Sequence, residues 1–120
     1  MTYYEPDRNI PQVRDLNHYV RDHIEFDVKY EMLKPMRDPN HIMYLLVCLA
    51  GETGESANVF KKYVRDGVMD WDHFAEEMVD VFVYLCMLFG YSEMDFEKAY
   101  QKKMRELHRR WGERKLAKQI

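Results

Sequence analysis

Two short acidic motifs carry the residues best suited to chemistry. Glu52 and Glu55 lie in the stretch AGETGESANVFKK, and Glu77 and Asp80 lie in the stretch EEMVDVFVYL. The members of each pair are three residues apart, so on a helix both carboxylates face the same way. Two such helices side by side would gather four carboxylates, a charge that needs a cation. Oxygen ligands without Cys or His favour Mg²⁺ or Mn²⁺ over zinc.

The neighbours of these acids distinguish them from an ordinary solvated helix face. At about 100° per residue, each pair borders the apolar stripe of its helix instead of lying opposite it. An unpaired charge at the border of a core is costly, and no nearby basic run can pair with all four acids. A cation, or a triphosphate carried on one, explains them most simply. Tyr84, one turn beyond Asp80, either flanks a bound sugar or base or packs in the core.

Basic residues at helical spacing could hold phosphate. Lys62 follows Glu55 by seven residues, two turns along the same face, where it would meet phosphate or form a salt bridge. Near the C-terminus, Lys103 and Arg110 are also seven residues apart and could clamp a phosphate. A basic helix of this kind is usually a solvated face or a non-specific polyanion site, so we expect no specific nucleic-acid partner.

Other reaction classes have no matching motif. The five histidines form no ligand pattern, and the lack of a Glu-x-x-His motif argues against a ferritin-like di-iron site. The segment GETGE lacks the Gly-Lys-Ser/Thr of a phosphate-binding P-loop, and no Ser or Cys nucleophile arrangement is visible. Cys48 and Cys86 lie in apolar stretches without a CxxC motif, which predicts small buried thiols in a reducing compartment.

Composition predicts one globular domain in the cytoplasm. A chain of 120 residues, 47% hydrophobic and 32% charged, can bury a core without disulfides. Charges occur throughout the N-terminal region, so no signal peptide is expected. The apolar run at residues 42–50 has nine residues, against the roughly 20 that span a membrane. We therefore expect no membrane partner.

Apolar periodicity predicts four main helices and no strand. The first runs from a cap at Asn9 to about Val28, and a connector with two prolines follows. The second runs from a cap at Asn40 to about Arg65, where an Asp-Gly pair ends it. Its first half, IMYLLVCLA, is apolar on every face, so we expect part of it to contact a second subunit.

The last two helices follow after short connections. The third is expected from a cap at Asp72 to Phe89, with Gly90 ending it. The fourth is expected from about Glu93 to Trp111, behind a capping box of a serine and an aspartate, and closed by a glycine. Short connections make antiparallel neighbours, so the second and third helices should pair and bring the acidic motifs face to face.

The two motifs together resemble the signature of the MazG-like all-α nucleoside triphosphate pyrophosphohydrolases. That signature is Glu-Glu-x-x-Glu, a variable gap, and Glu-x-x-Asp. Glu52, Glu55, Glu77 and Asp80 fit it, with 21 residues between the two halves, and the resemblance covers roughly residues 40–111. The paired motif is fairly specific, whereas either half alone is not.

Three positions depart from the family pattern or choose between its branches. Gly51 replaces the first Glu of the signature, as in the branch similar to dCTP pyrophosphatases, but that branch carries an aromatic residue where this chain has Lys62. The pattern GE-x-GE-x-AN-xx-KK looks closer to a branch common in bacteria and phages. The segment KMRELHRRW resembles a substrate-binding motif of Lys, Asn and Arg. Lys103 and Arg110 match it, and Leu107 stands where the Asn would be.

The resemblance implies an enzyme that cleaves ribo- or deoxyribonucleoside triphosphates between the α and β phosphates, in nucleotide-pool house-cleaning. The products would be a monophosphate and pyrophosphate. The four acids of the motifs would bind Mg²⁺, or Mn²⁺ in its place, and Glu52 or Glu55 would also take the proton of the attacking water. Lys62, Lys103 and Arg110 would hold phosphates.

The expected fold is all-α, a four-to-five-helix bundle of the all-α pyrophosphohydrolase type. We expect a single domain over residues 1–120, with a core at residues 40–111 and loose ends at residues 1–9 and 112–120. The bundle would be completed by oligomerisation, as a homodimer or a dimer of dimers.

Two other functions fit the same residues. One is a non-catalytic helical dimer whose acids are vestigial or hold a structural ion. The other is phosphoribosyl-ATP pyrophosphohydrolase, which shares the metal chemistry, although the GE-x-AN-xx-KK pattern fits it less well. A nucleic-acid binder that uses the basic last helix ranks behind both. Phe26, Tyr30 and His41 are candidates for contacts with the base.

Overall fold

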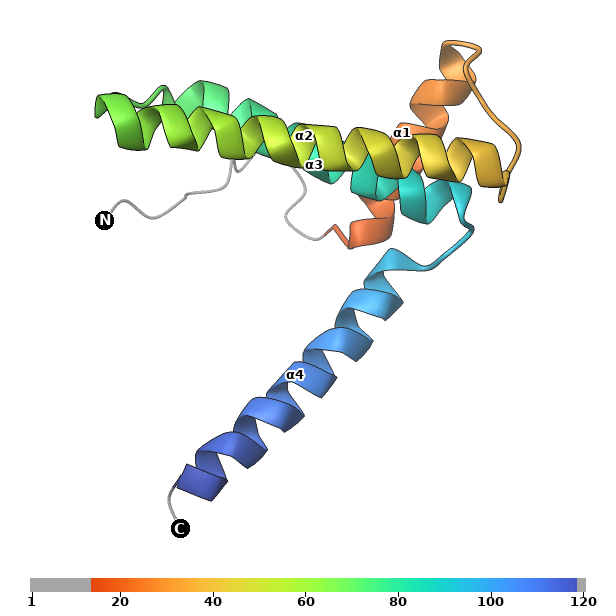
Figure 1. Cartoon of the computed structure of the whole chain (residues 1–120). Coiled ribbons are helices and arrows are strands. Elements are labelled where there is room, and N and C mark those ends of the chain that lie inside the picture. The colour runs from red at the N-terminus through yellow and green to blue at the C-terminus, as the bar shows by residue number, and fades with distance from the viewer. Residues whose placement is uncertain (1–13, 119–120) are drawn as a thin grey trace.

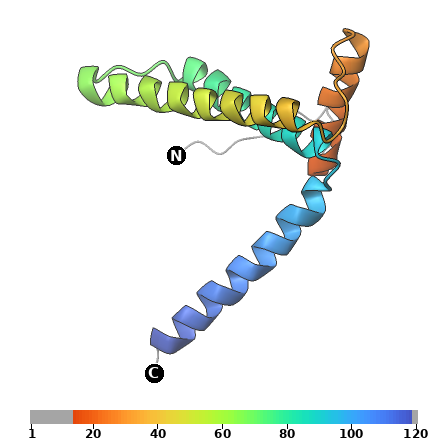
Figure 2. The same cartoon turned by 45° about the vertical axis from the view of Figure 1, so that its right-hand side comes forward.

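Four α-helices make up residues 14–118, the part of the chain that the computed structural model describes (Figure 1). They are α1 (Leu16–Lys29), α2 (Pro39–Asp66), α3 (Trp71–Tyr91) and α4 (Phe96–Lys118). α2 and α3 lie side by side and antiparallel, α1 crosses them at one end, and α4 points away (Figure 1, Figure 2). The expectation of an all-α chain is confirmed for these residues. None of the four helices is both long enough and apolar enough to cross a membrane.

The starts of α1 and α2 are fixed by aspartates. The Asp15 side chain accepts a hydrogen bond of 3.0 Å from a backbone N–H in the first turn of α1; the expected cap at Asn9 lies outside the described residues. Asp38 caps α2, two residues before the expected Asn40. That prediction was wrong because a proline follows Asp38, and proline fits the first helical position, where its missing N–H costs nothing. α2 ends as expected, at Gly67 with φ 77°.

α3 differs from the expectation at both ends. It starts after a cap at Asp70, not at Asp72, because either aspartate of the Asp-Trp-Asp sequence can cap a helix. It also continues through Gly90 to Tyr91. Gly90 lets α1 approach instead of ending the helix, since a Cβ at this position would lie 2.8 Å from Cδ1 of Ile24.

α4 also begins and ends elsewhere than expected. It begins at Phe96, not at Glu93, and the expected capping box of Ser92 and Asp95 does not form. Asp95 itself accepts a hydrogen bond of 2.9 Å from a backbone N–H in the first turn, whereas Ser92 caps the end of α3. The helix does not end at Gly112 but continues to Lys118. Strong helix formers on both sides outweigh the cost of one glycine, about 1 kcal/mol.

The core forms where α1 crosses α3. The buried apolar side chains make two clusters, Val20, Cys86 and Phe96 in one and Leu45, Leu88 and Tyr91 in the other. The hydroxyl of Tyr91, from α3, donates a hydrogen bond to the buried carboxylate of Asp27, from α1. Apolar contact and a buried polar contact therefore hold the same helix crossing.

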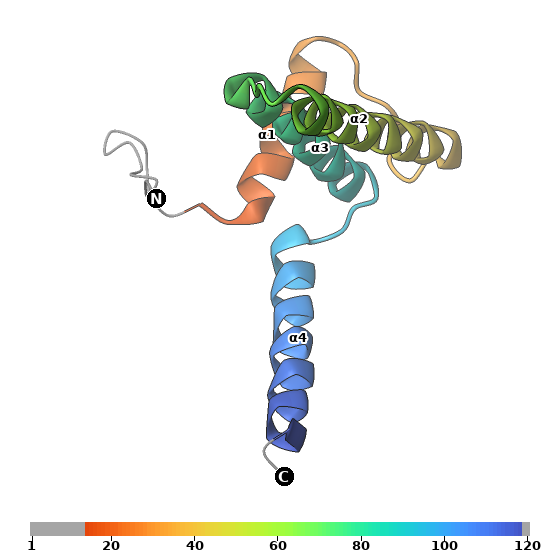
Figure 3. The ribbon, with the colours of Figure 1, turned by 60° about the vertical axis from the view of Figure 1, so that its left-hand side comes forward.

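α4 meets the other helices at its beginning. Phe96 stacks flat against Phe89 of α3, with 4.1 Å between the ring centroids, and its backbone N–H donates to an asparagine of α1. Farther along, α4 stands clear of α2 and α3 (Figure 3), and its aromatic stripe is open, with Tyr100 50% and Trp111 62% exposed. One chain therefore does not close the expected four-helix bundle. In the turn before α4, Glu93 adopts φ 55°, and the chain changes direction there.

Candidate metal centre and adjoining cavity

The antiparallel pairing of α2 and α3 brings three of the four predicted acids together. Glu52 and Glu55 of α2 and Glu77 of α3 each offer a carboxylate oxygen, and these oxygens lie within 4.8 Å of one another. The three-residue spacing puts the two α2 acids on one face, and α3 presents its acid to that face. Asp80, one turn farther along α3, stands outside this group of three. We call Glu52, Glu55 and Glu77 the acidic group.

Two of these carboxylates are partly withdrawn from water without a partner. Glu52 and Glu77 are half-buried, and Glu55 is exposed. Within residues 14–118, the buried Oε2 atoms of Glu52 and Glu77 have no hydrogen-bond partner. The other oxygen of Glu77 lies 3.6 Å from Nε2 of His73, one turn earlier on α3. Two buried carboxylate oxygens are therefore available to bind a cation or to accept a hydrogen bond.

Burial and like charges act together on Glu52. Its pKa is raised above the ordinary value, first by burial and then by the negative charges of Glu55, Asp80 and Glu77. Asp80 thus acts on the acidic group from outside it. A raised pKa means that the charged form of the carboxylate is unfavourable here. A cation among these oxygens would reverse that effect, and an all-oxygen donor set suits a hard ion such as Mg²⁺ or Mn²⁺.

A cavity of about 460 Å³ adjoins the acidic group, and we call it the Tyr84 cavity. Its lining comes from α1, the connector after α1, α2 and α3, and includes Glu52 and Asp80. The predicted Tyr84 also lines it and packs against the core from there. The pKa of Tyr84 is raised first by burial and then by the nearby Cys48. A cavity of this size with mainly apolar walls and a few polar groups is typical of small-molecule sites.

One of the three residues predicted to contact a base lines this cavity, namely Phe26. Tyr30 packs against the Phe26 ring, with 4.7 Å between the centroids, and so supports it from outside. His41 lies edge-on against Tyr91 at 4.6 Å, where it packs beside the core instead of lining the cavity.

The predicted phosphate-binding residues lie apart from the acidic group. Lys62 is exposed on α2, two turns beyond the acidic motif. Lys103 and Arg110 lie on α4, where Glu106 pairs with both, at 3.9 and 3.8 Å. Because α4 points away from α2 and α3 (Figure 3), one chain does not bring these two residues to the acids. Helical spacing identifies the face that they share, but it does not give the direction of the helix.

The sequence analysis did not identify two polar residues of this site, one beside Glu77 and one in the wall of the cavity. His73 lies four residues before Glu77, a spacing that puts both on one helix face. Asp27 lines the Tyr84 cavity although it is 6% exposed. The available signal was an acid on the apolar stripe of α1, three residues after Ile24.

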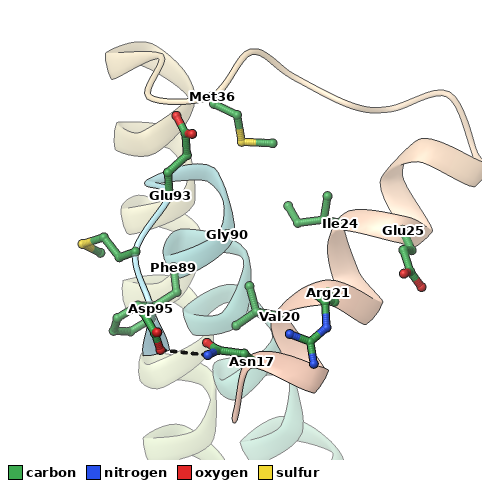
Figure 4. Close-up of a pocket in the computed structure, with 11 residues that line it drawn as sticks. Asn17, Val20, Arg21, Ile24, Glu25, Met36, Phe89, Gly90, Glu93 and Asp95 are labelled. Atoms are coloured by element: carbon green, nitrogen blue, oxygen red, sulfur yellow. Dashed lines mark hydrogen bonds between the residues drawn. The ribbon is translucent and has the colours of Figure 1, made fainter. Parts of the chain in front are cut away.

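A second cavity, of about 580 Å³, lies between α1, the connector and the turn before α4 (Figure 4). Val20, Ile24 and Phe89 give it an apolar side, and the amide of Asn17 donates to Asp95 across 2.8 Å at one end. None of the predicted site residues lines it. It is therefore separate from the acidic group.

Comparisons with protein-family models, with curated proteins and with solved structures give no match for this chain. The family resemblance therefore rests on the motifs and their spacing. The roles of individual residues have to come from the geometry of the site itself.

Proposed function

We propose that the chain is a Mg²⁺-dependent nucleoside triphosphate pyrophosphohydrolase of the MazG-like type. Water would attack the α phosphorus of a ribo- or deoxyribonucleoside triphosphate, and the bond from that phosphorus to the bridging oxygen would break. The products are the monophosphate and pyrophosphate. One observation carries the proposal: Glu52, Glu55 and Glu77 offer oxygens within 4.8 Å of one another beside a cavity of nucleotide size.

The acids of the two motifs would share the work of binding and proton transfer. Glu52, Glu55 and Glu77 would hold the metal, with Asp80 beside them. When bound, Mg²⁺ neutralises charge on phosphate oxygens and orients a water for in-line attack. Glu52 or Glu55 would also take the proton of the attacking water, since both carboxylates lie beside the proposed metal.

The Tyr84 cavity would hold the sugar and the base. Tyr84 lies one turn beyond Asp80 on α3, so its ring can flank the sugar while the phosphates stay near the acids. Phe26, from α1, offers a second aromatic surface in the same cavity. Between them the two rings would exclude water from one side of the bound nucleotide.

We further propose that a second copy of the chain completes the enzyme, as a homodimer or a dimer of dimers. Two apolar surfaces are open, one on α2 at Met43, Leu46 and Val47 and the other on α4. α4 is basic and the α2–α3 pair is acidic, so opposite charges favour α4 of one copy against α2 and α3 of another. Lys103 and Arg110 of the partner subunit would then meet the phosphates. Light scattering after gel filtration should give the mass of two or four chains, and a single-chain mass would contradict this assembly.

The compartment follows from the substrate and the thiols. Nucleoside triphosphate pools are cytoplasmic, and Cys48 and Cys86 are both free, as in proteins of reducing compartments. We therefore propose a cytoplasmic site of action.

The test is pyrophosphate release from a panel of ribo- and deoxyribonucleoside triphosphates, with Mg²⁺ and then with EDTA. Metal-dependent release of pyrophosphate and monophosphate supports the proposal, whereas release of single phosphate indicates a different triphosphatase. Turnover of phosphoribosyl-ATP alone would move the assignment to that substrate. Mg²⁺-dependent stabilisation without turnover of any of these would instead support a non-catalytic dimer with a structural or vestigial ion site.

A further inference from the structure

Asp27 is a buried charged residue that the proposed chemistry does not use. It lies on α1 and is 6% exposed. The hydroxyl of Tyr91, itself fully buried, donates to its Oδ2 atom. No other side chain of residues 14–118 donates a hydrogen bond to this carboxylate. Among these residues, the other oxygen, Oδ1, is therefore left to accept a hydrogen bond from a ligand.

The free acceptor belongs to the same cavity as the acidic motifs. Asp27 lines the Tyr84 cavity together with Glu52 and Asp80. Its partner Tyr91 follows Asp80 by 11 residues on α3, which is about 16 Å along a helix axis. The cavity therefore extends along α3 from the acids toward the Asp27–Tyr91 pair. A nucleotide with its phosphates at the acids would extend its base toward Asp27.

The chemistry of one free acceptor limits which base fits. The exocyclic amino group of cytosine or adenine offers an N–H to a single carboxylate oxygen. Guanine pairs best with both oxygens of a carboxylate, and here Tyr91 occupies one of them. Uracil and thymine flank their ring N–H with two carbonyls, which a carboxylate repels. Hypoxanthine likewise places a carbonyl where adenine has its amino group.

His23 strengthens this match. It lines the same cavity and lies one turn before Asp27 on the same face of α1. In cytosine and adenine a ring nitrogen that accepts a hydrogen bond stands beside the amino group. A donor from His23 and an acceptor from Asp27 are therefore complementary to that edge of the base.

We propose that Asp27 is a specificity-determining residue that accepts a hydrogen bond from the exocyclic amino group of the base. The site then prefers cytosine and adenine nucleotides to their oxo counterparts. The inference rests on the proposed function, since it takes the ligand to be a nucleotide whose phosphates lie at the acidic group. A base-edge contact of this kind discriminates by roughly 10- to 100-fold.

The experiment compares two pairs of substrates that differ by one amino or oxo group, CTP with UTP and ATP with ITP. With Mg²⁺ and wild-type protein, kcat/KM should be about tenfold or more higher for the amino member of each pair. Asp27→Asn should bring both ratios close to one, because a carboxamide can donate to the carbonyl. The matched control is Tyr91→Phe, which loses the same hydrogen bond and keeps the carboxylate, so both ratios should persist. Circular dichroism checks that both variants fold.

Three results would overturn the proposal. In the first, the wild-type protein hydrolyses both members of each pair equally well. In the second, Asp27→Asn lowers every activity by one factor and keeps the ratios, which would make the Asp27–Tyr91 contact purely structural. The third result applies if the protein hydrolyses no triphosphate. Loss of hydrolysis alone overturns the proposed function but does not test the role of Asp27. Calorimetric binding of the same four nucleotides then decides, and equal binding or no binding overturns the proposal.

Discussion

The two halves of α3 differ in burial and in charge, and we call residues 81–91 the packed half and residues 71–80 the acidic half. Residues 81–91 hold three buried side chains, Cys86, Leu88 and Tyr91, and this half is where α1 crosses. Residues 71–80 hold no buried residue, yet they carry Glu77 and Asp80. Since both halves are one continuous helix, the packed half helps to set the position and rotation of the acidic half. Trp71 and Phe74 of the acidic half also pack against aromatic rings of α2. Both sets of contacts therefore position the acidic group.

Burial has opposite consequences near the two halves. It raises the pKa of the Cys86 thiol to about 11, and with the Asp27 hydrogen bond it raises that of Tyr91 to about 12. Both groups are then neutral at pH 7, so their burial leaves no uncompensated charge. Near the acidic half, burial and like charges raise the pKa of the Glu52 carboxylate, which makes its charged form unfavourable. One region therefore stabilises the fold, whereas the other holds a carboxylate whose charged form is unfavourable.

The largest effect is expected from Glu77→Gln in the acidic half. A carboxamide is a weaker metal ligand than a carboxylate, so metal-dependent turnover should fall by about 100-fold or more. The helical content should remain, because Glu77 makes no contact in the packed half. Pyrophosphate release at several Mg²⁺ concentrations measures the change.

Glu76→Gln is the matched control. Glu76 is the neighbouring residue on α3, is exposed and lies outside the acidic group, so its loss should leave turnover within about twofold of wild type. Full activity in Glu77→Gln, or equal losses in the two variants, would end the assignment of the metal centre.

Gly90→Ala should instead destabilise the packing of α1 against the packed half of α3. The added Cβ would lie 2.8 Å from Cδ1 of Ile24 and 3.2 Å from Cγ1 of Val20. Overpacking costs roughly 1–3 kcal/mol, and the better helix propensity of alanine returns about 1 kcal/mol. We expect a net loss of about 1 kcal/mol in the free energy of unfolding, measured in urea.

Gly112→Ala on α4 is the control for Gly90→Ala. No atom lies within 4 Å of a Cβ built at Gly112, so this variant should gain up to about 1 kcal/mol. If the two substitutions shift stability in the same direction, α1 does not constrain Gly90, and the contrast between the halves of α3 loses its structural basis.

The third prediction concerns the pH dependence of the metal-free protein. Because the folded-state pKa of Glu52 is raised, its contribution to stability is full below the ordinary pKa and is lost as pH rises through the raised value. In EDTA, wild type should therefore lose stability relative to Glu52→Gln between about pH 4.5 and neutrality. Mg²⁺ should restore the melting temperature of wild type at neutral pH by several degrees and leave the variant unchanged. A constant difference between the two proteins across this range would contradict the proposed origin of the raised pKa.

The acidic half could be predicted from the sequence more fully than the packed half. Helical spacing predicted that the two acids of each motif share a face, and the short connection between α2 and α3 predicted that the acidic stretches would pair. Gly90 shows what sequence alone does not reveal. A glycine that ends a helix and a glycine that lets another helix approach cannot be distinguished in a single sequence. The direction of α4 follows from a turn in which Glu93 has φ 55°, and no propensity favours that conformation for glutamate. Asp27 was missed because its partner Tyr91 is remote in sequence, so local spacing does not show their contact.

The smallest effect is expected from Lys103→Ala, which asks whether α4 serves the acidic half. α4 leaves from the packed half, yet its basic residues are proposed to hold phosphates at the acids of another copy. One exposed lysine near a phosphate contributes on the order of 1 kcal/mol, so KM should rise about fivefold with kcat unchanged. Lys102→Ala, also exposed on α4, is the control and should leave KM unaltered. An unchanged KM in Lys103→Ala would remove α4 from the site and leave the acidic half to bind the triphosphate through its metal alone.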